Sequence, residues 1–110
     1  MGNDVDDVLA LDMLYKYMDA GKINLLAIMT NKNGAGSAHF LDIMNTWYGY
    51  PNIPIGIVRN GAKCDNTNNY AQIVSDMKVD GKPMFRTTVP DVTKLPDAEK
   101  LYRKVLARQP

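Results

Sequence analysis

Three aspartates crowd the beginning of the chain, at Asp4, Asp6 and Asp7. Carboxylates this close in sequence repel one another unless a cation or strong hydrogen bonds compensate their charge. Ca²⁺ and Mg²⁺ are hard cations that prefer such oxygen ligands. The cluster is therefore a candidate metal site. The same acids also precede an apolar periodic segment, and a helix dipole favours negative charge there. Spacing alone leaves both interpretations open.

The cluster does not fit the EF-hand type of calcium loop. A loop beginning at Asp4 would need ligands at its third and fifth positions and glycine at its sixth. Asp6 occupies the third position, but Val8 and Leu9 occupy the fifth and sixth. This class of calcium site is excluded.

A glycine-containing loop and the single cysteine are two further candidates for chemistry. Gly34-Ala35-Gly36 falls between a predicted strand and a predicted helix, where phosphate-binding loops occur. It lacks the third glycine of the dinucleotide fingerprint and any Gly-Lys-Ser or Gly-Lys-Thr, so a plain turn is favoured. The single Cys64 excludes an internal disulfide framework and a multi-cysteine zinc site, and we expect a thiol without function.

The first half of the chain must position the acidic cluster. Apolar residues recur every three or four positions over 8–18, which predicts a helix with a wide buried face on which Met13 is core. Gly21 marks its end. Residues 23–30 are almost continuously apolar, which predicts a strand covered on both faces, as in parallel sheets. A turn-rich loop follows at 31–36.

The rest of the chain continues the alternation. We predict a helix at 37–48, with Trp47 packed against the sheet, and a short strand at 55–58. This order implies right-handed crossovers and a parallel sheet. A polar loop at 60–69 leads to a short helix at 70–77. An extended excursion at 78–95 and a last helix at 96–108 complete the outline.

Composition limits the function classes. The 110 residues make one domain at most, and 45% of them are hydrophobic, as in globular proteins. The net charge of +1 predicts no attraction to nucleic acid or to an anionic membrane. No apolar run approaches the roughly 18 residues of a membrane span. No apolar signal segment opens the chain, which favours a cytoplasmic location without settling it.

Four segments, 2–11, 25–33, 48–57 and 97–107, carry a family resemblance. Gly2-Asn3-Asp4-Val5-Asp6-Asp7 with its apolar helix resembles the N-terminal motif of the inosine–uridine-type nucleoside hydrolases. The other three segments are similar to the family's second strand, its third strand and the helix before its fourth. The resemblance implies a three-layer, open, mostly parallel sheet flanked by helices. Residues 1–110 would be the N-terminal part of that α/β domain.

The resemblance also implies roles for individual residues. Asp7 matches an acid that binds Ca²⁺. Asp6 matches an acid that hydrogen-bonds the ribose hydroxyls, and with Asp7 it is assigned to the metal site. Asn33 is the better match for a sugar-contacting asparagine, with Asn31 second, and Asp4 has no assigned role. The implied reaction hydrolyses the N-glycosidic bond of a ribonucleoside to ribose and free base. Hydrogen bonds and carboxylates stabilise the oxocarbenium-like charge that builds on the sugar.

The chain departs from the family in what it lacks. The strand that carries the family's Asp-x-Asp pair, one of whose acids is the general base, has no counterpart in this chain. The family's later metal ligand, its later Asp and its leaving-group His have no counterpart either. No catalytic set is complete, and we expect no turnover by this chain alone. The two predicted strands would also make a marginal sheet, which suggests a fragment of a larger α/β protein.

Two alternatives come from other functional classes. Uncovered sheet edges would suit a non-enzymatic α/β module that self-associates into a homo-oligomer. The same acids would also suit a Mg²⁺-dependent phosphohydrolase, which would release phosphate instead of a reducing sugar.

Overall fold

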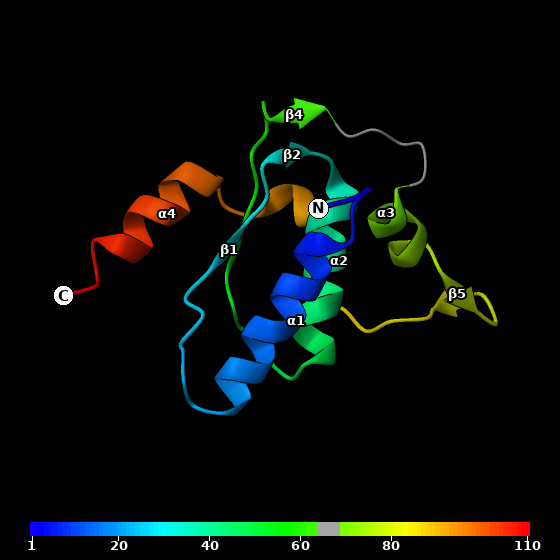
Figure 1. Cartoon of the computed structure of the whole chain (residues 1–110). Helices are drawn as coiled ribbons and strands as arrows, with labels where there is room; N and C mark the ends of the chain where they lie inside the picture. Colours follow the sequence, from blue (N-terminus) through cyan, green and yellow to red (C-terminus); the bar gives the residue numbers. More distant parts are fainter. Residues whose placement is uncertain (64–68) are drawn as a thin grey trace.

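Helices alternate with very short strands along the chain (Figure 1). The computed structural model describes residues 1–63 and 69–110, so Cys64 lies outside the described residues. The helices are α1 Asp6–Asp19, α2 Ala35–Trp47, α3 Tyr70–Ser75 and α4 Ala98–Leu106, with a 3₁₀ turn at Val92–Lys94. The strands are β1 Ile28–Met29, β2 Lys32–Asn33, β3 Ile55–Gly56, β4 Ala62–Lys63, β5 Lys78–Val79 and β6 Lys82–Pro83. The expected α/β class is confirmed.

The central strands pair in parallel, as the alternation of elements predicts. Ile28 of β1 lies opposite Ile55 of β3, and Met29 lies opposite Gly56. The N–H groups of Ile28 and Thr30 donate to the carbonyls of Pro54 and Gly56, each at 2.9 Å. Strands β2 and β4 form a second parallel pair at the carboxyl ends of these two strands.

Glycine is required in β3 by what packs against it. A Cβ at Gly56 would lie 2.9 Å from the Cα of Ala98 and 3.1 Å from a side-chain carbon of Leu101. Both residues are buried at the start of α4. The sequence therefore lets α4 approach the strand closely, which holds this helix on the sheet.

The strands are shorter than the sequence predicts. Residues 23–27 form no strand, although they continue the apolar run of 23–30. A strand exists only where a partner supplies its hydrogen bonds, and β1 pairs with the two-residue β3. The predicted strand at 55–58 likewise shortens to β3. Conversely, β2 lies within the predicted loop 31–36, because β4 gives its backbone a partner.

A buried tyrosine joins α1 to the centre of the fold. Tyr15 is fully buried, and its hydroxyl donates to the Oδ1 of Asn45 on α2. The amide of Asn45 donates in turn to the carbonyl of Ile53, just before β3, at 3.3 Å. The Tyr15 ring stacks on Tyr48 with 4.5 Å between centroids. Burial is the main cause that raises the pKa of Tyr15.

The buried face of α1 is narrower than predicted. Leu11 and Tyr15 are its buried residues. Leu9, Met13 and Tyr17 are exposed, so the assignment of Met13 to the core is wrong. Trp47 is also 73% exposed at the end of α2 and does not pack against the sheet as predicted. Periodicity predicts both helices correctly. It does not predict how much of each apolar face is buried against other elements.

A buried carboxylate fastens the region predicted as an extended excursion. Asp42 of α2 accepts hydrogen bonds from the backbone N–H groups of Thr88 and Val89, both at 2.9 Å. The Thr88 hydroxyl donates to the same carboxylate. Upstream, β5 and β6 form an antiparallel hairpin whose turn places Asp80 and Gly81 at positive φ. The excursion is thus a hairpin followed by a segment bound to α2.

We expect Tyr15→Phe to lower the free energy of unfolding by about 1–3 kcal/mol, because it leaves the buried Asn45 carbonyl oxygen without its donor. Urea denaturation measures the change. Tyr102→Phe, on the exposed face of α4, is the matched control and should change stability by less than about 0.5 kcal/mol. Equal effects of the two substitutions would contradict a structural role for the Tyr15–Asn45 contact.

The difference between wild type and Tyr15→Phe should also depend on pH. In the unfolded chain Tyr15 ionises near its ordinary pKa of about 10, whereas burial keeps it protonated in the fold. The contribution of the protonated Tyr15 hydroxyl to the free energy of unfolding is fully present below pH 10, and it is lost as the pH rises further. The gap between the two proteins should close by about 1.4 kcal/mol per pH unit above pH 10. A gap that stays constant to pH 11 would contradict this.

Candidate functional site

The two aspartates of the family motif lie in the first turn of α1 and are exposed. Asp7 Oδ2 lies 2.9 Å from the amino group of Met1. The residue before the helix, Val5, provides no side-chain cap. The carboxylates of Asp6 and Asp7 therefore stabilise the helix start through its dipole. This geometry is compatible with the interpretation of the two acids as charges that stabilise the helix start, without a metal.

Asp7 also borders a groove between α1 and β1. The groove has a volume of about 430 Å³, and Asp7, Thr30 and Asn31 supply polar groups to it. Its other walls are mostly apolar and include Ala10 and Leu14 of α1 and the two residues of β1. An acid at a helix start, next to the carboxyl end of a parallel strand, is a common arrangement of α/β binding sites.

Thr30, directly after β1, is the unusual member of this groove. The residue is 7% exposed, and its hydroxyl has no hydrogen-bond partner among the described residues. A buried hydroxyl without a partner costs free energy, so such groups mark places where a partner is absent or a ligand binds. Nothing in the sequence singled out Thr30, because an apolar strand commonly ends in threonine.

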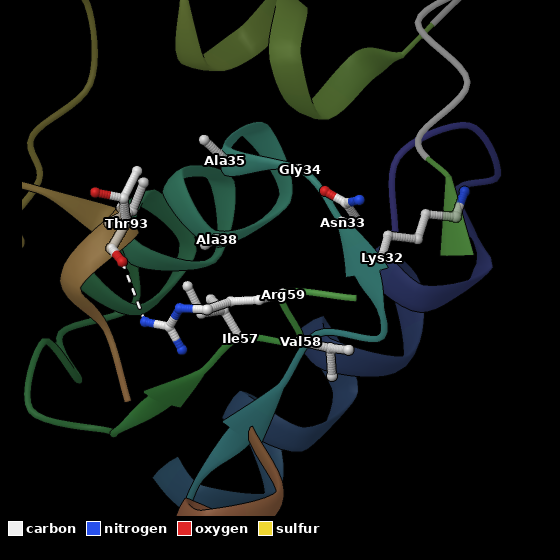
Figure 2. Close-up of a pocket in the computed structure, with 10 residues that line it drawn as sticks. Lys32, Asn33, Gly34, Ala35, Ala38, Ile57, Val58, Arg59 and Thr93 are labelled. Atoms are coloured by element: carbon white, nitrogen blue, oxygen red, sulfur yellow. Dashed lines mark hydrogen bonds between the residues drawn. The ribbon is translucent and has the colours of Figure 1, made fainter. Parts of the chain in front are cut away.

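Asn33 lies elsewhere. It lines a cavity of about 200 Å³ with Lys32, Arg59 and Thr93, as Figure 2 shows. Arg59 donates to the backbone carbonyls of Thr93 and Leu95 at 3.2 and 2.8 Å, so its guanidinium serves to hold the segment before α4. Asn33 does not line the groove that Asp7 borders, whereas Asn31 does.

Gly36, in the first turn of α2, is explained by packing. Gly36 is buried, and a Cβ there would lie 2.4 Å from the Oε1 of Gln72 and 3.3 Å from its Cα. Helix α3 can therefore approach α2 only because this residue lacks a side chain. The predicted turn ends earlier than expected, because Ala35 and Gly36 already belong to α2.

Sequence reasoning missed one residue beside the acidic cluster. The Tyr70 hydroxyl accepts a hydrogen bond from the Gly2 N–H at 3.1 Å, and the Tyr70 N–H donates to the Gly2 carbonyl at 2.8 Å. Burial raises the pKa of Tyr70, the hydrogen bond from Gly2 opposes this, and the charges of the nearby aspartates raise it further. No local pattern could have found this contact, because the two residues are 68 positions apart.

The described residues supply only part of a calcium coordination shell. No group of three or more His, Cys, Asp or Glu side chains in 1–63 and 69–110 could hold a metal ion. Asp7 is already paired with the Met1 amino group. Ca²⁺ takes six to eight oxygens, and Asp6 and Asp7 would supply a minority of them. These residues alone therefore provide no complete metal-dependent catalytic site.

Comparisons with known proteins leave the family undecided. The chain matches no family model, no curated protein and no solved structure at a significant level. Within the described residues, no helix is both long enough and apolar enough to cross a membrane. The site must therefore be interpreted from its own residues.

Thr30→Val should be neutral or should stabilise the fold by up to about 1 kcal/mol. The substitution replaces a buried hydroxyl that has no partner with a methyl group of similar size. Thr88→Val is the contrasting variant, because it removes the hydroxyl that donates to Asp42, and it should destabilise by about 1 kcal/mol. Urea denaturation of both proteins tests this. A clear loss of stability in Thr30→Val would show that its hydroxyl is satisfied in solution.

Proposed function

We propose that this chain is part of a calcium-dependent nucleoside hydrolase, which hydrolyses the N-glycosidic bond of ribonucleosides. The proposal includes a nucleoside hydrolase-like three-layer fold in which the sheet continues beyond β1. In this assignment the chain carries part of the sugar-binding and metal-binding residues and does not turn over substrate by itself. A complete catalytic set would need acids that lie outside this chain.

The position of Asp7 is the observation that carries the proposal. Asp7 lies in the first turn of α1 beside the carboxyl end of β1, with Asn31 at the same groove. Ligands of open α/β sheets bind outside the carboxyl ends of the strands. The resemblance of residues 2–11 and 25–33 to the nucleoside hydrolases assigns sugar and metal contacts to this edge. Position and resemblance thus agree on where a ligand would bind.

Each residue would make a defined contribution. The exposed carboxylate of Asp6 would accept hydrogen bonds from the ribose hydroxyls. Asp7 would give carboxylate oxygens to Ca²⁺ in place of its ion pair with the Met1 amino group, and Ca²⁺ held there would supply Lewis acidity. An asparagine amide, from Asn33 or from Asn31, would hold the sugar. The negative charge of the aspartates would favour the positive charge that develops on the ribose.

A calcium titration of the isotopically labelled chain by NMR tests the metal assignment. We expect the amide signals around Asp6 and Asp7 to shift with millimolar affinity, because few protein oxygens are present. Asp7→Asn should abolish the shifts. Asp19→Asn, an exposed acid at the far end of α1, should leave them unchanged. Shifts that persist in Asp7→Asn, or that never occur, would remove the metal assignment.

A product assay tests the reaction class separately. With inosine or uridine and CaCl₂, the chain alone should release no ribose, whereas a longer protein containing it should release a reducing sugar. Phosphate release from a phosphomonoester with MgCl₂ would favour the phosphohydrolase alternative. Because this assay uses the longer protein, it can fail while the calcium titration succeeds.

A further inference from the structure

We propose that Asn60 is a site of spontaneous deamidation, at which the side-chain amide is lost and an isoaspartyl bond forms in the main chain. Asn60 lies in the loop between β3 and β4, its side chain is exposed, and Gly61 follows it. The reactants are the chain itself and water. The proposal goes beyond the nucleoside hydrolase assignment and does not depend on it.

The reaction is a ring closure between the two neighbouring residues. The amide nitrogen of Gly61 attacks Cγ of Asn60, so that a new N–Cγ bond replaces the Cγ–Nδ2 bond. The proton from the Gly61 nitrogen leaves with the side-chain nitrogen as ammonia. Water then opens the cyclic imide. Opening at Cγ gives aspartate, whereas opening at the main-chain carbonyl leaves the chain running through Cβ and Cγ, which is isoaspartate.

Two asparagines of the sequence precede a glycine, and their surroundings in sequence match. Lys32-Asn33-Gly34-Ala35 and Arg59-Asn60-Gly61-Ala62 differ only in the basic residue that comes first. Glycine favours ring closure because it has no side chain to obstruct the attacking nitrogen. The two pairs should therefore react at nearly the same rate in an unfolded chain, and a difference between them in the folded chain must come from the structure.

The fold restrains the first of these pairs. Asn33 belongs to β2 and lies opposite Lys63 of β4 in the parallel ladder. Gly34 is the N-cap residue of α2 and has an extended backbone. Ring closure must turn the peptide plane between the two residues. At Asn33 this movement breaks hydrogen bonds of the strand pair and displaces the start of a helix.

The second pair lacks such restraints. Neither Asn60 nor the N–H of Gly61 makes a hydrogen bond to any residue that the structure describes. The next backbone hydrogen bond along the loop is the one from the Ala62 N–H to the Asn31 carbonyl, at 3.2 Å. The peptide plane between Asn60 and Gly61 can therefore turn without the loss of a hydrogen bond of its own.

Packing explains why a glycine must follow Asn60. A Cβ at Gly61 would lie 2.4 Å from the Asn31 carbonyl oxygen and 3.0 Å from a side-chain carbon of Val58. The carbonyl belongs to the backbone and cannot give way as the end of a flexible side chain would. Glycine thus lets the loop approach the start of β2 closely. The reactive Asn-Gly pair is a consequence of this contact.

Conversion of Asn60 would disturb the same contact. An isoaspartyl bond adds a carbon to the main chain directly before Gly61, and a carboxylate replaces the neutral amide. Gly61 then loses its place against the Asn31 carbonyl, and the hydrogen bond from Ala62 is weakened. Asn31 also lines the groove beside Asp7. Deamidation at Asn60 would therefore loosen one wall of that groove.

Peptide mass spectrometry of the chain, incubated at mildly alkaline pH, tests the proposal. The rate at each asparagine in the folded chain is divided by its rate in guanidinium chloride, where the fold is absent. We expect folding to slow Asn33 by at least about fivefold, the equivalent of one hydrogen bond, and Asn60 by less than about twofold. Electron-transfer fragmentation identifies the isoaspartate. Equal slowing of the two sites, or stronger slowing at Asn60, would overturn the proposal.

Two matched variants test the structural consequence. Asn60→Gln keeps a side-chain amide but reacts far more slowly, because its longer side chain must close a larger ring. Asn33→Gln leaves Asn60 in place and is the control. After equal incubation, the Ala62 amide signal in NMR spectra should shift in the wild type and in Asn33→Gln, and should stay unchanged in Asn60→Gln.

Circular dichroism before the incubation checks that both variants have the wild-type fold. An Ala62 signal that shifts equally in all three proteins would show that the change does not come from Asn60. A signal that stays in place although isoaspartate has formed at Asn60 would contradict the disturbance of the contact between Gly61 and Asn31.

Discussion

The hydrogen bond between Tyr15 and Asn45 is the contact on which the arrangement of the first half depends. Both side chains are buried, and Asn45 continues the connection to the Ile53 carbonyl. These two consecutive hydrogen bonds thus fix α1, α2 and the segment before β3 relative to one another. A buried amide is costly unless each of its groups is paired, so alternative packings of these elements are disfavoured. The acids of α1 and the strand end at Thr30 keep their relative positions because of it.

Local patterns were sufficient to predict the helices and the parallel pairing. Three- and four-residue spacing gave α1 and α2, and the Pro-Asp start gave α4. These features depend on neighbours in sequence, where propensity, capping and periodicity act. The strand lengths failed because hydrogen-bonded partners decide them, and a run such as 23–27 has none among the described residues.

The candidate site was predictable in part for the same reason. Adjacent acids at a helix start are visible in the sequence, and Asp6 and Asp7 do lie in the first turn of α1. Their surroundings depend on long-range packing. The Met1 amino group beside Asp7, the Tyr70–Gly2 contact and the unpartnered hydroxyl of Thr30 all arise from the tertiary fold. That Asn31 and not Asn33 lines the groove beside Asp7 could not have been obtained from spacing either.

The single tryptophan has a consequence for how this molecule can be observed. Trp47 lies at the solvent-exposed end of α2, and its ring meets Phe85 edge to face with 6.2 Å between centroids. Phe85 belongs to the segment that Asp42 fastens through Thr88 and Val89. Emission from the indole therefore reports on the attachment of that segment to α2. The indole does not report on the buried Tyr15, which packs against another side of α2 and belongs to the core cluster, so a change in emission can precede loss of the core.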